Sequence, residues 1–215
     1  MIRIRWHGHS CFEIGNDLTI VTDPHDGRSI GIEPPRVKGD IILISHSHYD
    51  HDKGLRITEK PDSVAIKEEA GEREIKGVRI LGIGAFHDDA GGSKRGKIVI
   101  YRFELDGISF CHMGDIGHLP GREIVDKIKG VDILFVPVGG VFTVDARGAW
   151  EIIDMVSPRV AIPMHYKVSG LSIPVAHLCQ FTKGHDDQIV NVGNEIEVDR
   201  SDLPDEFEVW SFSRD

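Results

Sequence analysis

Cysteine is scarce in this chain of 215 residues, which has three widely separated copies: Cys11, Cys111 and Cys179. That set makes neither a disulfide framework nor a CxxC zinc motif, so we expect a reducing compartment. Long apolar runs are also lacking. The most apolar later segment, residues 133–144, is too short to span a bilayer and contains Pro137, and the N-terminus has no signal-peptide core. We therefore expect a cytoplasmic protein that does not insert into membranes.

Positive charge is the next shortage: 25 Lys and Arg stand against 35 Asp and Glu, giving a net charge of −10. A negative surface repels polyanions, which disfavours nucleic acid as a partner. The sequence contains no GxSxG or catalytic-cysteine pattern, so nothing indicates a covalent nucleophile. Histidine, in contrast, is abundant, with 12 residues, and this excess points to metal chemistry.

The pattern of apolar residues indicates alternating strands and helices with antiparallel hairpins between them. This favours an α/β fold with mixed sheets in one domain, residues 1–215, because no linker or low-complexity segment divides the chain. Residues 39–44 and 130–135 are loosely alike, which suits two similar halves. The predicted strands are 2–6, 11–14, 18–21, 41–44, 78–83, 98–105, 108–111, 133–136 and 160–163, and the predicted helices are 121–129, 146–156 and 174–184.

The segment with the clearest chemistry is residues 45–52, SHSHYDHD, directly after the buried strand 41–44. Imidazole and carboxylate groups suit zinc or a similar divalent ion. His46 and His48, two apart in an extended loop, can bind one ion. Asp50 and His51 then face a neighbouring position, at the spacing of about 3.5 Å typical of two-metal sites. Chance would produce this HxHxDH pattern roughly 0.004 times in such a chain, so it favours a metal site over a solvated loop.

This motif resembles the signature of the metallo-β-lactamase superfamily, and the resemblance covers nearly the whole chain. It implies that His46, His48 and His87 bind a first metal, that Asp50, His51 and His165 bind a second, and that Asp115 bridges the two. It also implies that Asp23 orients the histidine loop from behind. His87 is selected by its position between motifs and by the resemblance alone, with His112 as a rival that we expect to be packed in the core.

Three shorter segments, residues 8–10, 114–118 and 162–166, are similar to the branch of ascorbate-6-phosphate lactonase-like proteins. That resemblance implies a four-layer αβ/βα sandwich of two mixed β-sheets flanked by helices, with a dinuclear site at one edge. It also implies a compact hydrolase that acts on a small, anionic ester, lactone or phosphodiester.

For the mechanism we expect two divalent ions, Zn²⁺ first with Mn²⁺ or Fe²⁺ as alternatives, and a bridging hydroxide as nucleophile. Asp50 would orient the attacking oxygen, and His118 would assist the leaving group. Substrate contacts are expected from His9 and from Lys94 and Arg95 in a glycine-rich, cationic segment. Structural histidines and a solvated turn explain these last residues equally well.

Other functions remain open at this point. An RNA or nucleotide phosphodiesterase uses the same metal chemistry, but the net negative charge disfavours it. A di-iron redox protein is a third hypothesis. His48 disfavours it, because the flavodiiron relatives have an acidic residue at the second histidine of the motif. A metal-binding protein without catalysis and a homo-oligomer are both compatible with the sequence.

Overall fold

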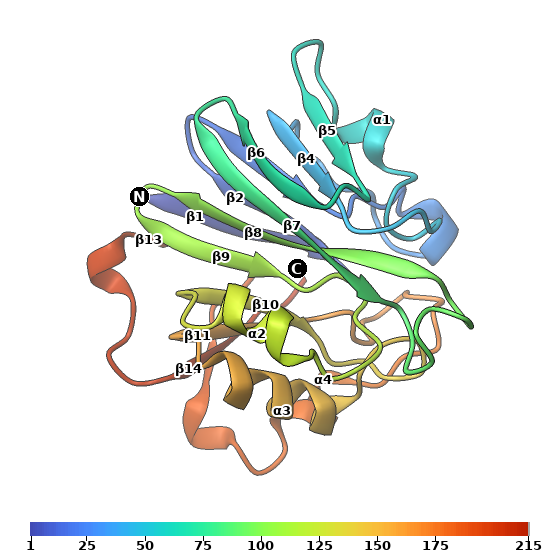
Figure 1. Ribbon diagram of the computed structural model, residues 1–215, viewed down its shortest axis with the longest axis vertical. Helices are drawn as coiled ribbons and strands as arrows, with labels where there is room; N and C mark the ends of the chain where they lie inside the picture. Colours follow the sequence, from blue (N-terminus) through green and yellow to red (C-terminus); the bar gives the residue numbers. More distant parts are fainter. Residues whose placement is uncertain (215) are drawn as a thin grey trace.

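Two β-sheets pack face to face in the computed structural model, which describes residues 1–214 (Figure 1). Each sheet has both parallel and antiparallel pairs, so the predicted mixed α/β class is confirmed. The first sheet contains, in spatial order, β13 (Glu195–Val198), β1 (Ile2–Gly8), β2 (Cys11–Gly15), β3 (Thr19–Thr22), β4 (Ile41–Ile44) and β5 (Val64–Lys67). The second contains β12 (Ile189–Asn191), β14 (Glu208–Ser211), β11 (Val160–Met164), β10 (Ile133–Pro137), β9 (Ile108–His112), β8 (Lys97–Leu105), β7 (Val78–Phe86) and β6 (Gly71–Ile75).

Helices lie outside both sheets. The longest, α3, begins after Asp145, whose carboxylate accepts a hydrogen bond from the Gly148 N–H as an N-cap, and it ends before Pro158 as predicted. Figure 1 shows α2, α3 and α4 beside β10 and β11, and α1 beside β5 on the opposite side. The resulting order of helix, sheet, sheet and helix is the predicted four-layer sandwich. The helices are α1 (Leu55–Thr58), α2 (Arg122–Ile128), α3 (Ala146–Val156) and α4 (Leu178–Thr182). Within residues 1–214, none has the length and apolar character needed to cross a membrane.

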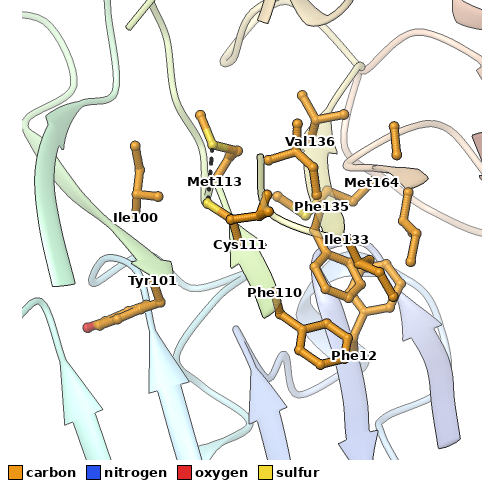
Figure 2. Close-up of a cluster of buried hydrophobic side chains, with 14 of the residues drawn as sticks. Phe12, Ile100, Tyr101, Phe110, Cys111, Met113, Ile133, Phe135, Val136 and Met164 are labelled. Atoms are coloured by element: carbon orange, nitrogen blue, oxygen red, sulfur yellow. Dashed lines mark hydrogen bonds between the residues drawn. The ribbon is translucent and has the colours of Figure 1, made fainter. Parts of the chain in front are cut away.

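The core fills the space between the sheets. All four residues of β4 are buried, as expected for a strand covered on both faces. Phe12 of the first sheet meets Phe135 of the second with ring centres 4.6 Å apart, and Figure 2 shows both beside Phe110. Each aromatic side chain buried in this way contributes about 1.5–3 kcal/mol to stability. This rigid interior fixes the strand ends from which the polar loops emerge.

The C-terminal third departs from the prediction. The helix expected over residues 174–184 is only α4, and residues 171–176 before it form neither helix nor strand. Leu171, Ile173 and Val175 alternate along the chain and pack against Ile30 and Ile32 in a small second apolar cluster. An alternating apolar pattern suits extended backbone, so Pro174 does not begin a helix. Strands β5, β6, β12 and β13 were not anticipated, because most of their side chains are exposed or half-buried. Strand β14 was also missed, although three of its four residues are buried.

Parallel pairing brings polar segments from distant parts of the chain to one edge. The neighbours β3 and β4 are parallel, and so are β9, β10 and β11. Their carboxyl ends point in the same direction within each sheet, and the loops that follow hold most of the residues singled out from the sequence. Chemistry at the carboxyl ends of parallel strands is therefore a direct result of the topology.

Candidate metal centre

A buried polar cluster lies where these strands end. Residues 45–52 follow β4, and single side chains follow five other strands, namely His9, Asp23, His87, Asp115 and His165. Every candidate ligand among them except His48 is buried, although charged and imidazole groups normally stay at the surface. The structure thus brings together all seven residues that the sequence assigned to metal binding.

His46, His48 and His87 form the first group. Each offers a ring nitrogen, and these nitrogens lie within 4.8 Å of one another. The ring centres of His46 and His48 are 4.4 Å apart, and that of His87 is 4.8 Å from His46. Three imidazoles converging on one point are a ligand set that suits a divalent transition metal. His87, which only the resemblance selected, is therefore placed where a ligand would be.

The second group contains Asp50, His51 and His165, joined by His9, with ligand atoms again within 4.8 Å of one another. His9 Nε2 lies 3.1 Å from Asp50 Oδ2, and its ring centre lies 4.2 Å from that of His165. His9 is completely buried and stands among the candidate ligands. Its expected contact with the substrate stays a prediction. Its position directly after a strand was the signal that could have placed it here.

Asp115 lies between the two groups. Its Oδ2 atom is 3.1 Å from His165 Nε2 and 3.2 Å from His51 Nε2. The same oxygen is 3.6 Å from His87 Nε2 and 3.9 Å from His46 Nε2. One carboxylate oxygen thus faces imidazoles of both groups, which is the arrangement of a bridging ligand.

Several buried polar atoms of the cluster make no hydrogen bond within residues 1–214. Such atoms are rare in folded proteins, because losing water without gaining a partner costs roughly 1–3 kcal/mol each. Most are atoms that coordinate cations, so a metal ion would satisfy them. They are His9 Nδ1, His46 Nε2, His51 Nε2, His87 Nδ1, Asp115 Oδ1 and both ring nitrogens of His165. The donor set fits the expected divalent metals.

Asp23 orients the histidine loop from behind. Its carboxylate accepts hydrogen bonds from the backbone N–H and the hydroxyl of Ser45, both at 2.7 Å, and lies 3.1 Å from His51 Nδ1. Ser45 Oγ is also 2.9 Å from His46 Nδ1. In the neutral form of each ring, a proton on Nδ1 leaves Nε2 as the atom that can bind a cation, and His51 would release its second proton when a metal binds. Asp23 thus sits where the sequence placed it, whereas Ser45 was missed although it directly precedes His46.

The charges of the cluster shift one another's pKa values. Burial alone would raise the pKa of Asp115, but the neighbouring His165 and His51 hold that pKa well below its usual value. Burial would lower the pKa of His51, but three carboxylates, Asp115 first, raise it well above the usual value. Burial, together with repulsion from His51, lowers the pKa of His46 to about 3. Asp115 is thus ionised and His46 neutral at pH 7, the forms that bind cations.

Backbone strain is concentrated at the same place. His9, Asp23 and His165 have φ angles of 56°, 37° and 57°, in the left-handed region that costs non-glycine residues free energy. Gly139 leaves room beside the strained turn, because a Cβ atom at this position would lie 2.0 Å from the His165 carbonyl oxygen. The left-handed backbone at these three residues lowers the free energy of unfolding, and it directs their side chains into the cluster.

His118 does not join the cluster. Its Nδ1 donates a hydrogen bond to the Leu119 carbonyl at 2.8 Å, and its Nε2 accepts one from the Phe86 N–H at 3.2 Å. Both ring nitrogens therefore have backbone partners, and neither is left to protonate a leaving group. The expectation that His118 assists the leaving group is thus not supported by this geometry. His118 instead fixes the loop after β9 against the end of β7. The rival His112 is buried and packs near Phe135, as expected.

The cationic segment is not an open anion site. Its backbone N–H groups converge on the buried carboxylate of Asp88, with four hydrogen bonds of 2.7–2.9 Å from Ala90, Gly92, Lys94 and Arg95. Burial would raise the pKa of Asp88, but these donors lower it to about 2. Lys94 Nζ pairs with Asp89 at 2.7 Å, and the Arg95 guanidinium lies over the Phe142 ring. The geometry thus gives no support to substrate binding by Lys94 and Arg95.

Comparison with known proteins gives the family. A model of the β-lactamase superfamily domain matches residues 3–165. A metal-dependent hydrolase of Thermoplasma acidophilum is 30% identical over 192 residues, covering 79% of this chain and 85% of that protein. A metal-dependent hydrolase of Thermococcus onnurineus is 29% identical over 190 residues, covering 77% of this chain and 85% of the relative.

Solved structures agree with these sequence matches. A Thermotoga maritima protein, assigned as a Zn-dependent hydrolase of the metallo-β-lactamase superfamily, superposes with a TM-score of 0.81 at 33% identity. The match covers 99% of this chain and 98% of that one. A metallo hydrolase of Ignicoccus hospitalis has the same fold, with a TM-score of 0.64 at 20% identity over 86% of this chain and 91% of its own.

Proposed function

This chain belongs to the metallo-β-lactamase superfamily and is a metal-dependent hydrolase, and from that premise we propose that it holds two divalent ions side by side to cleave a small ester, lactone or phosphodiester. The observation that carries the proposal is the position of Asp115 Oδ2, which lies 3.1–3.9 Å from imidazole nitrogens of both ligand groups. A carboxylate oxygen shared between two groups of ligands has a clear role only when both groups hold an ion.

Each residue has a defined part in this proposal. The ions would lower the pKa of a water molecule toward 7 and polarise the oxygen of the bond to be cleaved. His46, His48 and His87 would hold one ion, and His51, His165 and Asp50 the other, with Asp115 between them. Asp50 is fixed by His9 Nε2 at 3.1 Å, which leaves its second oxygen to orient the attacking water. Asp23 keeps His51 turned inward.

The nature of the ligands supports Zn²⁺ as the native metal, with Mn²⁺ and Fe²⁺ as alternatives. Five imidazoles and two carboxylates make a nitrogen-rich set, which zinc prefers over calcium or magnesium. The Zn-dependent assignment of the Thermotoga maritima relative supports the same choice. The similarity of residues 8–10, 114–118 and 162–166 to lactonase-like proteins supports a lactone or another cyclic ester among the substrates.

Metal reconstitution tests the proposal. The purified protein is stripped with a chelator and titrated with Zn²⁺, Mn²⁺ or Fe²⁺, while hydrolysis of lactones, aryl esters, aryl phosphodiesters and an RNA oligonucleotide is followed. We expect two equivalents of metal per chain and recovery of lactone or ester hydrolysis. We also expect His46→Ala to lose both bound metal and activity. Saturation at one equivalent would contradict the dinuclear site, and full activity of His46→Ala would contradict the metal mechanism.

A further inference from the structure

Eight large apolar side chains are exposed in residues 1–214, and three of them lie on loops that follow strands ending at the metal centre. Tyr49, Leu119 and Val141 are 49%, 41% and 62% exposed. They lie in the loops after β4, β9 and β10, and the first two of these loops supply ligands. We call these three side chains the apolar rim. Isolated exposed apolar residues need no explanation, but a set gathered on the loops around one site does.

Two members of the rim flank the first ligand group. Tyr49 lies between His48 and Asp50 in the chain, and it keeps half its surface in solvent while Asp50 is buried. Leu119 is held by His118, whose two ring nitrogens bond its carbonyl and the Phe86 N–H. Phe86 directly precedes the ligand His87. Through this link, Leu119 is positioned beside the His87 side of the centre.

Val141 flanks the second group and is strained. Its φ angle is 61°, which a β-branched side chain rarely adopts. The loop is fixed on both sides: Gly139 packs against the His165 carbonyl, and the Val144 N–H donates to the carbonyl of Ile116, next to Asp115. Within residues 1–214, the packing of the Val141 side chain does little to offset the cost of this strain, because most of its surface faces solvent. Strain of this kind, maintained beside a reactive centre, is typical of a contact made with a ligand.

One cation lies beside the rim, because Lys53 Nζ is 5.6 Å from the centre of the Tyr49 ring, whereas Lys94 and Arg95 have other partners. Lys94 is paired with Asp89, and Arg95 lies 5.2 Å from the centre of the Phe142 ring. The loop of these cations also has its backbone N–H groups bound to Asp88. A substrate approaching the metals therefore meets apolar surface on the loops after β4, β9 and β10.

From these observations we propose that the apolar rim binds an alkyl or aryl group of the substrate next to the bond that is cleaved. This inference rests on the proposed hydrolase function and narrows it to esters or lactones that carry an apolar chain or ring. Tyr49, Leu119 and Val141 are specificity residues in this proposal. The negative charge of the substrate, if it has one, is received at the metals.

A series of acyl chains tests the proposal. We measure kcat/KM of the metal-loaded enzyme for p-nitrophenyl acetate, butyrate and hexanoate, and expect an increase of about tenfold or more from acetate to hexanoate, since each buried methylene favours binding about fourfold. Val141→Asn removes the apolar group but accepts a left-handed backbone. We expect it to reduce the hexanoate-to-acetate ratio by about threefold or more. Met155→Gln, which changes an exposed apolar residue on α3, is the matched control and leaves the ratio unchanged.

Two further measurements separate the possible outcomes. Calorimetry with methylphosphonate and hexylphosphonate measures binding without turnover, and we expect hexylphosphonate to bind at least about tenfold more tightly. The Tm of Val141→Asn should equal or exceed that of the unaltered protein, because strain is relieved. Ester hydrolysis with no dependence on chain length, or a lowered Tm with an unchanged ratio, would overturn the rim proposal while leaving the proposed function intact. Absence of hydrolysis for every ester, lactone and phosphodiester, with selective phosphonate binding, would instead overturn the proposed function.

Discussion

Two polar loops of this protein differ in whether their buried polar atoms have hydrogen-bond partners. Residues 45–52 bury His46 and His51, whose Nε2 atoms have no hydrogen-bond partner within residues 1–214. Residues 88–96 bury Asp88, whose carboxylate accepts four backbone N–H groups of its own loop. In the first loop, buried polar atoms lack partners that a cation would supply. In the second loop, the buried carboxylate has all its partners within the loop.

The difference shows what marks a binding site in this fold. Both loops are rich in polar residues and each adjoins a strand of the core, so polarity alone does not separate them. Their hydrogen bonds do, because a buried atom without a partner is a free-energy cost that a ligand can remove. Substitutions in the two loops should therefore differ sharply in their effect on metal content and catalysis.

The largest effect is expected for Asp115→Asn. The substitution keeps the size of the side chain but removes the charge that faces four imidazoles. A loss of several kcal/mol in charge stabilisation corresponds to a decrease in kcat/KM of about a thousandfold or more. Bound metal, measured by elemental analysis, should fall to one equivalent or less per chain.

Asp89→Asn, in residues 88–96, is the matched control for Asp115, which follows β9 and faces His46 and His51 of the histidine loop. Asp89 is exposed and pairs only with Lys94 within residues 1–214, so kcat/KM and metal content should stay within about twofold of the unaltered protein. Equal effects of Asp115→Asn and Asp89→Asn would contradict the distinction between the metal cluster and residues 88–96.

A smaller effect is expected from Asp23→Asn, which acts through the histidine loop. Asp23 accepts hydrogen bonds from Ser45 and lies 3.1 Å from His51 Nδ1, but it does not face the ions. Loss of such a supporting carboxylate lowers metal affinity or activity about 10–100-fold. Competition with a fluorescent chelator measures the affinity directly. Asp26→Asn, which removes only contacts with Ser29, is the control, and a similar loss in that variant would show that the effect is not specific.

The third prediction concerns acid stability of the metal-free protein. Burial lowers the pKa of His25 to about 3, while Nε2 bonds the His7 carbonyl. The unfolded chain therefore takes up this proton near pH 6.5, whereas the folded chain does not. The stabilisation is complete above pH 6.5 and is lost as the pH falls from 6.5 toward 3. Between pH 7.5 and 5.5, His25 should account for a decrease of about 1.4 kcal/mol in the free energy of unfolding.

Urea unfolding in the presence of a chelator measures this decrease. His25→Gln should reduce the difference in unfolding free energy between the two pH values by about 1.4 kcal/mol. His177→Gln changes an exposed histidine and should leave the difference as it is. An unchanged pH dependence in His25→Gln would show that His25 is accessible to protons in the folded state.

Much of the fold was accessible from the sequence, because the apolar pattern is strongest where burial is greatest. Residues 41–44 and 146–156 were predicted with their exact bounds, since one is a continuous apolar strand and the other an amphipathic helix with a cap. The edge strands β5 and β6 were not predicted, because their side chains face solvent and carry no pattern. Such strands are specified by pairing with a neighbour, which no local window contains.

The metal cluster was accessible for a different reason. His46, His48, Asp50 and His51 stand in one short motif, and the remaining ligands follow strands whose ends meet at one edge. The environment of single residues was not accessible. Nothing local in the sequence indicates that both nitrogens of His118 meet backbone groups. These facts depend on contacts between loops that are distant in the chain.

The smallest effect is expected for Lys94→Ala and Arg95→Ala, and it is the most direct test of the comparison between the loops. The Lys94 ammonium already pairs with Asp89, and an exposed pair of this kind contributes about 0.2–1 kcal/mol. The backbone N–H groups of both residues continue to bond Asp88 after the side chains are removed. We therefore expect kcat/KM within about twofold of the unaltered enzyme for anionic and neutral substrates alike, measured with both metals bound. An increase in KM of tenfold or more, confined to anionic substrates, would mean that these cations reach the substrate. The loop at 88–96 would then be part of the site, and its closed hydrogen bonding would serve to hold Lys94 and Arg95 in place.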